Sequence, residues 1–334
     1  MSLTVLSCGP GVTVQDAGRT GFLAQGLSRG GAVDRQALEE GAALLGQPVR
    51  TALEMAGLGG RFSFDAPARV ALTGAPMKAS LDGTPLRWQA SHRVPAGAVL
   101  DIGGVTAGCY GYLTVGGGFD VPEVLGARGA HLAAGLGDLV KAGDVLGLLP
   151  DRDDEAGMVL DVVPRWQGGE IRILPSLQTS LYAQSERDRF CATAFRRDAR
   201  GNRMGVRMAP PGEGFGLAAG QTILSEVITP GDIQIPGDGA PYVLLAECQT
   251  TGGYPRIGTV IPCDLPKVAQ APAGAEVRFR FVTREDALAA QAGFVRDMKG
   301  LRGRVKPLVR DPADVPELLG YTLISGVISG SEEE

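Results

Sequence analysis

The stretch PYVLLAECQTTGGYP (residues 241–255) begins with a short apolar run and ends in a turn of hydroxyl residues, glycines and a proline. Short apolar runs that glycine or proline bounds are typical of β-strands. Six other runs share this pattern: ARVALTGA (68–75), AGAVLDIG (96–103), GYLTVGGG (111–118), MVLDVV (158–163), EIRILPS (170–176) and EVRFRFVT (276–283). The chain is therefore predicted to be mainly β, with most of its strands antiparallel.

Helical patterns are few. Residues 34–45 carry one, with Asp34 placed to cap its start and Gly46 placed to end it, and residues 284–299 carry another. Both helices are expected to cover or plug a sheet.

A weak internal repeat indicates how the chain is organised. LEMAGLGGRFSF (53–64) can be laid on SEVITPGDIQIP (225–236), PARVALTGA (67–75) on APYVLLAEC (240–248), and PAGAVLDIG (95–103) on PAGAEVRFR (272–280). Order and spacing agree across all three matches. We therefore predict two related β-barrel-like halves, residues 1–150 and 158–310, with an acidic linker between them. Residues 311–334 form a C-terminal extension whose end is expected to be disordered.

Composition limits the function classes. The chain has 334 residues and a net charge of −5, which is small for its length. Nucleic acid and anionic membrane are therefore not expected partners. No apolar run approaches the roughly 18 residues that a membrane span needs, and the start lacks a signal-peptide pattern, so a cytoplasmic protein is expected.

Metal chemistry also has little support. The five cysteines include no CxxC pair, and only two histidines, His92 and His131, are available as further ligands. Reduced thiols and no metal site are expected. Both histidines lie in loop-like sequence, so we expect them at the surface or at an interface.

The segment ECQTTGGYP (residues 247–255) is a candidate ligand-binding turn. Gln249, Thr250 and Thr251 offer donors and acceptors, and glycine lets the backbone approach a ligand closely. Exposed backbone N–H groups in such a turn can hold an anion or the oxygen of an amide. The alternative is an ordinary Gly-Gly hairpin.

In other segments, the polar residues could either bind a ligand or serve a structural role. DARGNRMGVR (198–207) has three arginines that suit carboxylate or phosphate, or that form a solvated turn. Gln15, Asp16 and Arg19 fit a structural role, in which Asp16 and Arg19 could pair with each other. Asp34 fits a helix cap. Glu226 could supply an acid or base if its environment shifts its pKa.

Several common motifs are missing. The chain has no P-loop, no GxSxG elbow, no HExxH and no GxGxxG between a strand and a helix. If ATP is used, this sequence lacks the common phosphate cradle for it. DMKG (297–300) lacks the second methionine of a biotin attachment site, so Lys299 is expected to be an ordinary surface lysine without covalent biotin.

A family resemblance emerges from longer motifs. VTVQDAGRTG (12–21), GYLTVGGGFDVPEVLG (111–126), GNRMGVRM (201–208), GDIQIPGDGAPYVLLAECQTTGGYPRIGTVIPCDL (231–265) and KVAQAPAG (267–274) are similar to the allophanate hydrolase subunit 2 family, also called KipA or the C subunit of 5-oxoprolinase. The resemblance runs from about residue 9 to residue 281. QTTGGYP and NRMG are its most specific parts.

The resemblance implies a cyclophilin-like β-barrel topology and a multi-subunit enzyme. The expected partners are a protein like KipI or the B subunit of 5-oxoprolinase, and a protein like LamB/YcsF or the A subunit. Together with this family, such proteins hydrolyse 5-oxoproline to glutamate with ATP. Two alternatives are a carboxyltransferase component of a biotin-dependent urea or amide carboxylase, and a regulatory protein that binds a KipI-like kinase inhibitor.

The resemblance also implies which residues face the small amide substrate. Candidates for a catalytic role are Glu226, Gln249 and Tyr254, without a decision on acid or base. The expected substrate-binding residues are Asn202, Arg203, Gln234, Gln249, Thr250, Thr251, Gly252, Gly253 and Tyr254. The NRMG and QTTGGYP segments should therefore meet at one polar hollow.

Overall fold

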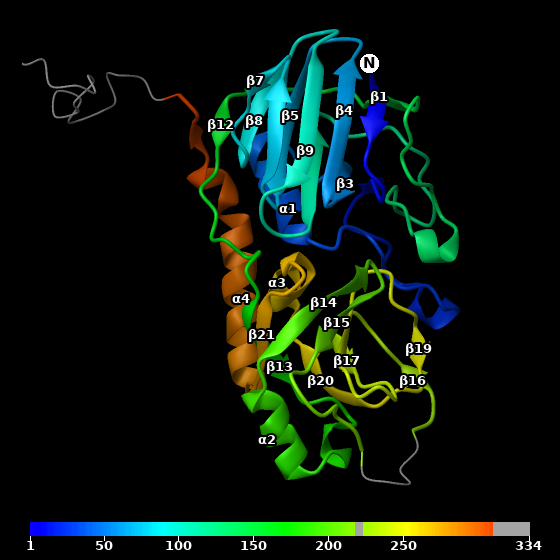
Figure 1. The fold of residues 1–334 in the computed structure, drawn as a ribbon. Helices are drawn as coiled ribbons and strands as arrows, with labels where there is room; N and C mark the ends of the chain where they lie inside the picture. The colour runs from blue at the N-terminus through cyan, green and yellow to red at the C-terminus, as the bar shows by residue number, and fades with distance from the viewer. Residues whose placement is uncertain (218–222, 310–334) are drawn as a thin grey trace, which may run out of the picture.

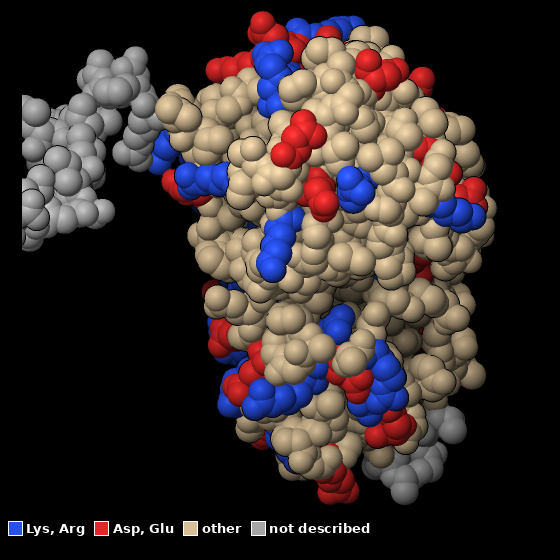
Figure 2. Space-filling view, turned by 45° about the horizontal axis from the view of Figure 1, so that its top comes forward, with Lys and Arg blue, Asp and Glu red and all other residues tan. Residues whose placement is uncertain are grey.

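The computed structural model describes residues 1–217 and 223–309. Two β-rich units are stacked in Figure 1, with the N-terminal unit above the C-terminal one and helix α4 (Arg284–Lys299) along one side. Lysines, arginines and acidic residues are interspersed over the face seen in Figure 2, without a large patch of one sign. The predicted extension at residues 311–334 lies outside the described residues.

The N-terminal unit contains two sheets. The first has six strands in the order β11 (Val145–Gly147), β1 (Ser2–Cys8), β4 (Leu58–Phe64), β9 (Val99–Val105), β6 (Met77–Leu81) and β7 (Thr84–Pro85). The second has seven strands in the order β2 (Thr13–Gln15), β3 (Ala52–Ala56), β10 (Tyr110–Val115), β5 (Ala68–Gly74), β8 (Ala90–Val94), β12 (Met158–Val159) and β22 (Lys306–Pro307). The short helical turns of this unit are Leu23–Gln25 and Leu132–Ala134.

An apolar core fills the space between these sheets. Val5 and Phe62 from the first sheet pack in one cluster with Leu72 and Leu113 from the second. Every residue of β5 and β10 is buried, because helix α1 (Arg35–Leu44) covers their other face. This double burial explains why their sequences are continuous apolar runs instead of alternating ones.

The start of α1 confirms the prediction made from its sequence. The Asp34 side chain accepts a hydrogen bond from the backbone N–H of Ala37 at 3.3 Å. Gly46 lies just beyond the helix with φ of 66°, a left-handed conformation that glycine adopts without strain. Helix α4 also matches its predicted bounds, and Lys299 at its end is exposed as expected.

The C-terminal unit is a closed barrel. Its strands follow the order β13 (Gly169–Leu174), β20 (Arg256–Val260), β17 (Asp232–Gln234), β18 (Tyr242–Leu244), β15 (Gly205–Ala209), β14 (Phe195–Asn202) and β21 (Glu276–Phe281). Beside it lie the two-stranded sheet of β16 (Glu226–Val227) and β19 (Thr251–Gly252), and helix α3 (Leu265–Gln270). The remaining helical turns are Thr179–Leu181, Pro262–Asp264 and Leu301–Arg304. Only β13 and β21 pair in parallel among the described strands.

Four phenyl rings fill one region of the barrel. Phe190, on helix α2 (Gln184–Ala192), contacts Phe195, Phe215 and Phe279 with ring centroids 5.1 to 5.4 Å apart. Helix α2 was not predicted, because Phe190 is its only buried residue and the rest of its sequence is polar. Without an apolar stripe, a helix leaves little periodic signal.

The mainly β prediction is confirmed, but only the C-terminal unit closes into a barrel. The N-terminal sheets keep separate edges, so this unit is better described as a two-layered arrangement of open sheets. The halves also differ in pairing: β4 pairs with β9, whereas their proposed counterparts β17 and β21 do not pair. The internal duplication therefore stays a prediction.

The boundary between the predicted halves is interwoven. Strand β12 and strand β22, at the two ends of the predicted second half, complete the second N-terminal sheet. The acidic segment before β12 is held in place, since both carboxylate oxygens of Asp151 accept hydrogen bonds from Arg69 at 2.6 and 2.7 Å. Residues 150–158 thus link β11 to β12 within the N-terminal unit, and the chain passes to the barrel only after β12.

Candidate functional site

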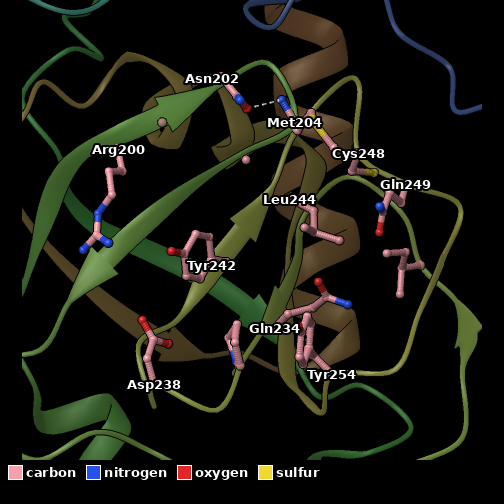
Figure 3. Close-up of a pocket in the computed structure, with 14 residues that line it drawn as sticks. Arg200, Asn202, Met204, Gln234, Asp238, Tyr242, Leu244, Cys248, Gln249 and Tyr254 are labelled. Carbon is pink, nitrogen blue, oxygen red and sulfur yellow. Dashed lines mark hydrogen bonds between the residues drawn. The ribbon is translucent and has the colours of Figure 1, made fainter. Parts of the chain in front are cut away.

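The two segments singled out by sequence line one cavity of the barrel unit. It has a volume of about 540 Å³ and lies beside the β14–β15 hairpin, β17, β18 and the turn after Ala246 (Figure 3). Its lining includes the predicted residues Asn202, Gln234, Gln249 and Tyr254. We call it the barrel cavity. Its geometry matches the expectation that NRMG and QTTGGYP meet at one hollow.

Gln234 is the most informative side chain of the barrel cavity. It is 7% exposed, and its Nε2 has no hydrogen-bond partner among the described residues. A buried donor without a partner costs about 1–3 kcal/mol, so native proteins seldom keep one without a reason. A ligand that accepts from Nε2 would remove this cost.

Gly252 explains how Gln234 fits beside the glycine turn. A Cβ atom at Gly252 would lie 2.5 Å from Gln234 Nε2 and 3.0 Å from Ile228 Cδ1. A larger residue at position 252 would therefore displace the Gln234 amide from its present position. Gly252 thus allows the backbone of the glycine turn to approach a side chain that lines the barrel cavity.

The rim of the barrel cavity carries a chain of charges. Arg200 binds Asp198 at 2.9 Å, Asp198 also accepts from Arg207 at 2.8 Å, and Arg207 reaches Asp238 at 3.1 Å. Hydrogen bonding from the Arg200 guanidinium holds the pKa of Asp198 well below its usual value. Arg200 and Asp238 both line the cavity (Figure 3). Arg200 is the cationic lining residue that an anionic ligand would meet.

The Asn202 side chain stabilises the turn between β14 and β15. Its Oδ1 accepts a hydrogen bond from the Met204 backbone N–H at 2.8 Å, which closes the β14–β15 turn (Figure 3). This turn presents the rest of the hairpin end to the cavity. Asn202 therefore shapes the site as well as lining it.

Arg203 does not line the barrel cavity, contrary to the expectation for it. Its Nε donates to Glu247 Oε1 at 2.6 Å, its Nη1 binds Glu54 Oε1, and its Nη2 donates to the Gly31 carbonyl at 2.7 Å. Tyr112 adds a hydrogen bond to Glu54 at 2.6 Å. Because Glu54 and Gly31 belong to the N-terminal unit, this Arg203 cluster joins the two units.

The other predicted residues are distributed around the barrel cavity. Thr250 and Thr251 line a neighbouring cavity. A Cβ atom placed on Gly253 would lie 3.3 Å from the Oγ of Ser225. Glu226 is paired with Arg256 at 2.5 Å and accepts from Gln178 at 2.8 Å, outside the lining of the barrel cavity. Glu226 therefore fits an ion pair better than a free acid or base.

Asp16 and Arg19 do not pair with each other, as their sequence would have allowed, and each bonds to the backbone instead. Asp16 accepts from the backbone N–H groups of Gly18 and Arg128, and Arg19 donates to the carbonyls of Val124 and Gly129. Gln15 donates to the Ala130 carbonyl at 3.2 Å. Each of these side chains thus holds the loop of residues 121–131 by its backbone.

A second buried cluster between the units was not predicted. Arg165 donates to Asp34 at 2.8 Å and to Glu40 at 2.8 and 3.1 Å, and Gln270 donates to Asp34 at 2.8 Å. Burial alone would lower the pKa of Arg165, but Asp34 and Glu40 raise it above its usual value. Asp34 is therefore both a helix cap and part of this Arg165 cluster.

Both histidines are buried. The expectation of a surface or interface position is wrong for His92, whereas His131 lies at an interface between the two units. His92 lies within strand β8 and bonds through Nε2 to the Arg87 carbonyl at 2.8 Å. His131 is 3% exposed and bonds through Nε2 to Ser28 Oγ at 2.9 Å, at the junction of the units. Burial lowers the pKa of each below the usual 6.5, and for His131 the nearby Glu247 opposes this effect.

These lowered pKa values predict acid sensitivity. Since the unfolded histidines bind protons more readily than the folded ones, the free energy of unfolding should fall as pH drops below about 6.5. Urea unfolding between about pH 7.5 and 5.5 should show this decline, and His92→Asn with His131→Asn should flatten it. An unchanged pH slope in the double variant would contradict the prediction.

Comparison with known protein families places the chain in a known class. The carboxyltransferase domain family, subdomains A and B, matches residues 25–281, and the chain belongs to this family. The resemblance seen in the motifs is thereby confirmed. Among the described residues, no helix is both long and apolar enough to cross a bilayer.

Particular relatives narrow the comparison. The chain is similar to the C subunit of 5-oxoprolinase from Escherichia coli, with 34% identity over 91% of this chain and 98% of that protein. It is also similar to a putative urea carboxylase of Emericella nidulans, with 27% identity over 98% of this chain but only 28% of that protein. The solved urea carboxylase of Kluyveromyces lactis shares the fold, with a TM-score of 0.80 at 24% identity over 93% of this chain and 31% of that chain.

Proposed function

We propose that this chain is the C subunit of an ATP-dependent 5-oxoprolinase, a cytoplasmic hydrolase that opens 5-oxo-L-proline to L-glutamate. The similarity to the C subunit of the Escherichia coli enzyme covers nearly the whole length of both proteins. The observation that carries the proposal is the unpartnered amide of Gln234 in the barrel cavity. A cyclic amide brings the acceptor that this donor lacks.

The barrel cavity fits an anionic cyclic amide in three respects. Gln234 Nε2 can donate to the ring carbonyl, Arg200 at the rim can face the carboxylate, and Tyr254 and Leu244 offer apolar contact to the ring (Figure 3). An amide carbonyl is a poor electrophile, so phosphorylation of its oxygen with ATP would activate it for attack by water. Donors already positioned around that oxygen would stabilise its developing charge.

ATP use belongs to the complex in this proposal, because the sequence of this chain has no P-loop. The expected partners are the protein like KipI or the 5-oxoprolinase B subunit and the protein like LamB/YcsF or the A subunit. The chain alone should therefore release no glutamate.

Reconstitution tests the proposed function. Purified chain, mixed with the A and B subunits of the same enzyme, ATP and 5-oxoproline, should produce glutamate, whereas any two of the three proteins should not. Omitting ATP serves as the control for uncoupled hydrolysis. Absence of glutamate from the complete mixture, with all three proteins folded and associated, would argue against this function.

A second function has support from one comparison. The similarity to a putative urea carboxylase extends over 98% of this chain, and the family is a carboxyltransferase family. As a carboxyltransferase component, the chain would need a biotin carboxylase and a biotin carrier supplied by other proteins. Carboxylation of urea with those proteins, without glutamate release in the mixture above, would favour this second function.

A further inference from the structure

A second cavity lies at the junction of the two units. It has a volume of about 470 Å³ and is lined from the N-terminal unit by residues 26–28 and by His131 and residues 133–134. Its other wall is the strip of residues 247–251 together with Met204. We call it the junction cavity. Since Met204, Cys248 and Gln249 line both cavities, this strip separates the junction cavity from the barrel cavity.

A serine-histidine pair lines the junction cavity. Ser28 and His131 are both buried, and Ser28 Oγ bonds to His131 Nε2 at 2.9 Å. The other ring nitrogen, Nδ1, is buried without a hydrogen-bond partner among the described residues. If Ser28 donates to Nε2, Nδ1 carries a proton to donate; if Nε2 donates, Nδ1 is a free acceptor. In either tautomer, Nδ1 keeps a hydrogen-bonding capacity that no described residue uses.

The backbone holds this pair closely between the units. A Cβ at Gly30, whose φ is 61°, would lie 2.8 Å from the His131 ring, so glycine lets the ring pack there. Gly30 in turn donates to the carbonyl of Ala246 at 3.0 Å, directly before the strip that separates the cavities. The ring therefore has a fixed position relative to the strip.

The charge of the lining restricts the ligand class. Glu247 is the single acidic or basic residue among the described lining, apart from the His131 ring. Its Oε1 accepts from Arg203 at 2.6 Å and its Oε2 from the Ala133 backbone N–H at 3.1 Å. An anion would meet this carboxylate without a free cation to offset it, and a cation would find both oxygens already bonded.

We infer that the junction cavity is a second ligand site, distinct from the barrel cavity, for a small uncharged molecule that both donates and accepts hydrogen bonds. The His131 ring forms part of the buried lining, and the hydroxyls of Ser28 and Thr250 and the amide of Gln249 supply further polar groups. The two cavities thus differ in the charged side chains of their linings: Arg200 and Asp238 line the barrel cavity, whereas Glu247, already bonded to Arg203, lines the junction cavity.

Histidine NMR can test this directly, because the chain has only two histidines. The probe is 2-pyrrolidinone, a cyclic amide without a carboxylate, titrated into the whole chain with labelled histidine. The His131 ring signals should shift saturably, while those of His92, bonded to the Arg87 carbonyl in strand β8, should not move. 5-Oxoproline, which is anionic, should leave the His131 signals in place.

Variants assign the shift to one cavity. Ala134→Phe adds bulk at an exposed position of the junction lining and should weaken the probe's apparent affinity by about tenfold or more. Gln234→Met, in the barrel cavity, should leave it unchanged. No shift of His131 in the wild-type chain, equal shifts of both histidines, or loss of the shift in Gln234→Met would each overturn the inference. Because 5-oxoproline hydrolysis is measured separately, the proposed function can fail while this site stands.

Discussion

Replacing Arg203 by methionine is expected to lower the free energy of unfolding by about 3–5 kcal/mol, because removal of one partner leaves buried charges without compensation. Glu54 and Glu247 are both almost fully buried, and each loses a direct ion pair with the guanidinium. The Gly31 carbonyl loses its donor at 2.7 Å as well. Urea unfolding of the whole chain measures the change from the shift in midpoint.

Two further variants test whether the cost of Arg203→Met comes from its buried ion pairs. One removes an exposed arginine elsewhere, and the other also removes the two carboxylates that Arg203 binds. Arg280 forms an ion pair with Glu170 at 2.9 Å in which both side chains are more than half exposed, so Arg280→Met should cost about 0–1 kcal/mol. Adding Glu54→Gln and Glu247→Gln to Arg203→Met should recover part of the lost stability, since no buried carboxylate then lacks its cation. Equal effects of Arg203→Met and Arg280→Met would show that the cluster does not hold the units together.

Local patterns predicted several of the strands because burial leaves a direct trace in sequence. The runs at residues 68–75 and 111–118 became β5 and β10, which are buried on both faces. Asp34 and Gly46 bounded α1 as expected, since capping depends on a few neighbouring atoms. Helix α2 was missed for the converse reason, because one buried phenylalanine gives no periodicity.

Side-chain partners that are distant in sequence could not be predicted in the same way. Arg203 stands beside Asn202 in the NRMG motif, yet its partner Glu54 lies 149 positions away in the other unit. Nothing near Arg203 in sequence distinguishes an arginine that faces a ligand from one that joins two units. Arg165 and Glu40, 125 positions apart, form the second cluster under the same limitation.

The sequence predicted those residues of the candidate site that two backbone turns bring to the cavity. The β14–β15 turn and the glycine turn after Ala246 bring Asn202, Gln249 and Tyr254 to one cavity, as the motifs indicated. His131 was expected at the surface or at an interface, and its sequence alone could not decide between the two. Its burial arises from Ser28 and Gly30 of a distant loop, which only the packing of the two units brings together.

Replacing Gln234 by methionine should separate activity from stability. Methionine has a similar volume but no donor, so in the reconstituted enzyme kcat/KM for 5-oxoproline should fall by about tenfold to a hundredfold, as for loss of one buried hydrogen bond. The unfolding free energy should stay the same or rise by about 1 kcal/mol, because Nε2 has no protein partner to lose. A residue with a purely structural role would show the opposite combination.

A matched glutamine provides the control for Gln234→Met. Gln184 is exposed on α2 and donates to Asp188 at 2.7 Å, within its own helix and outside the lining of the barrel cavity. Gln184→Met should change neither kcat/KM nor stability appreciably. If Gln234→Met keeps full activity, or loses stability as a residue with bonded partners would, then the barrel cavity does not bind the reacting amide through Gln234.

Reduced activity with unchanged association of the three proteins would instead argue that the chain contributes to the chemistry and does more than regulate a partner.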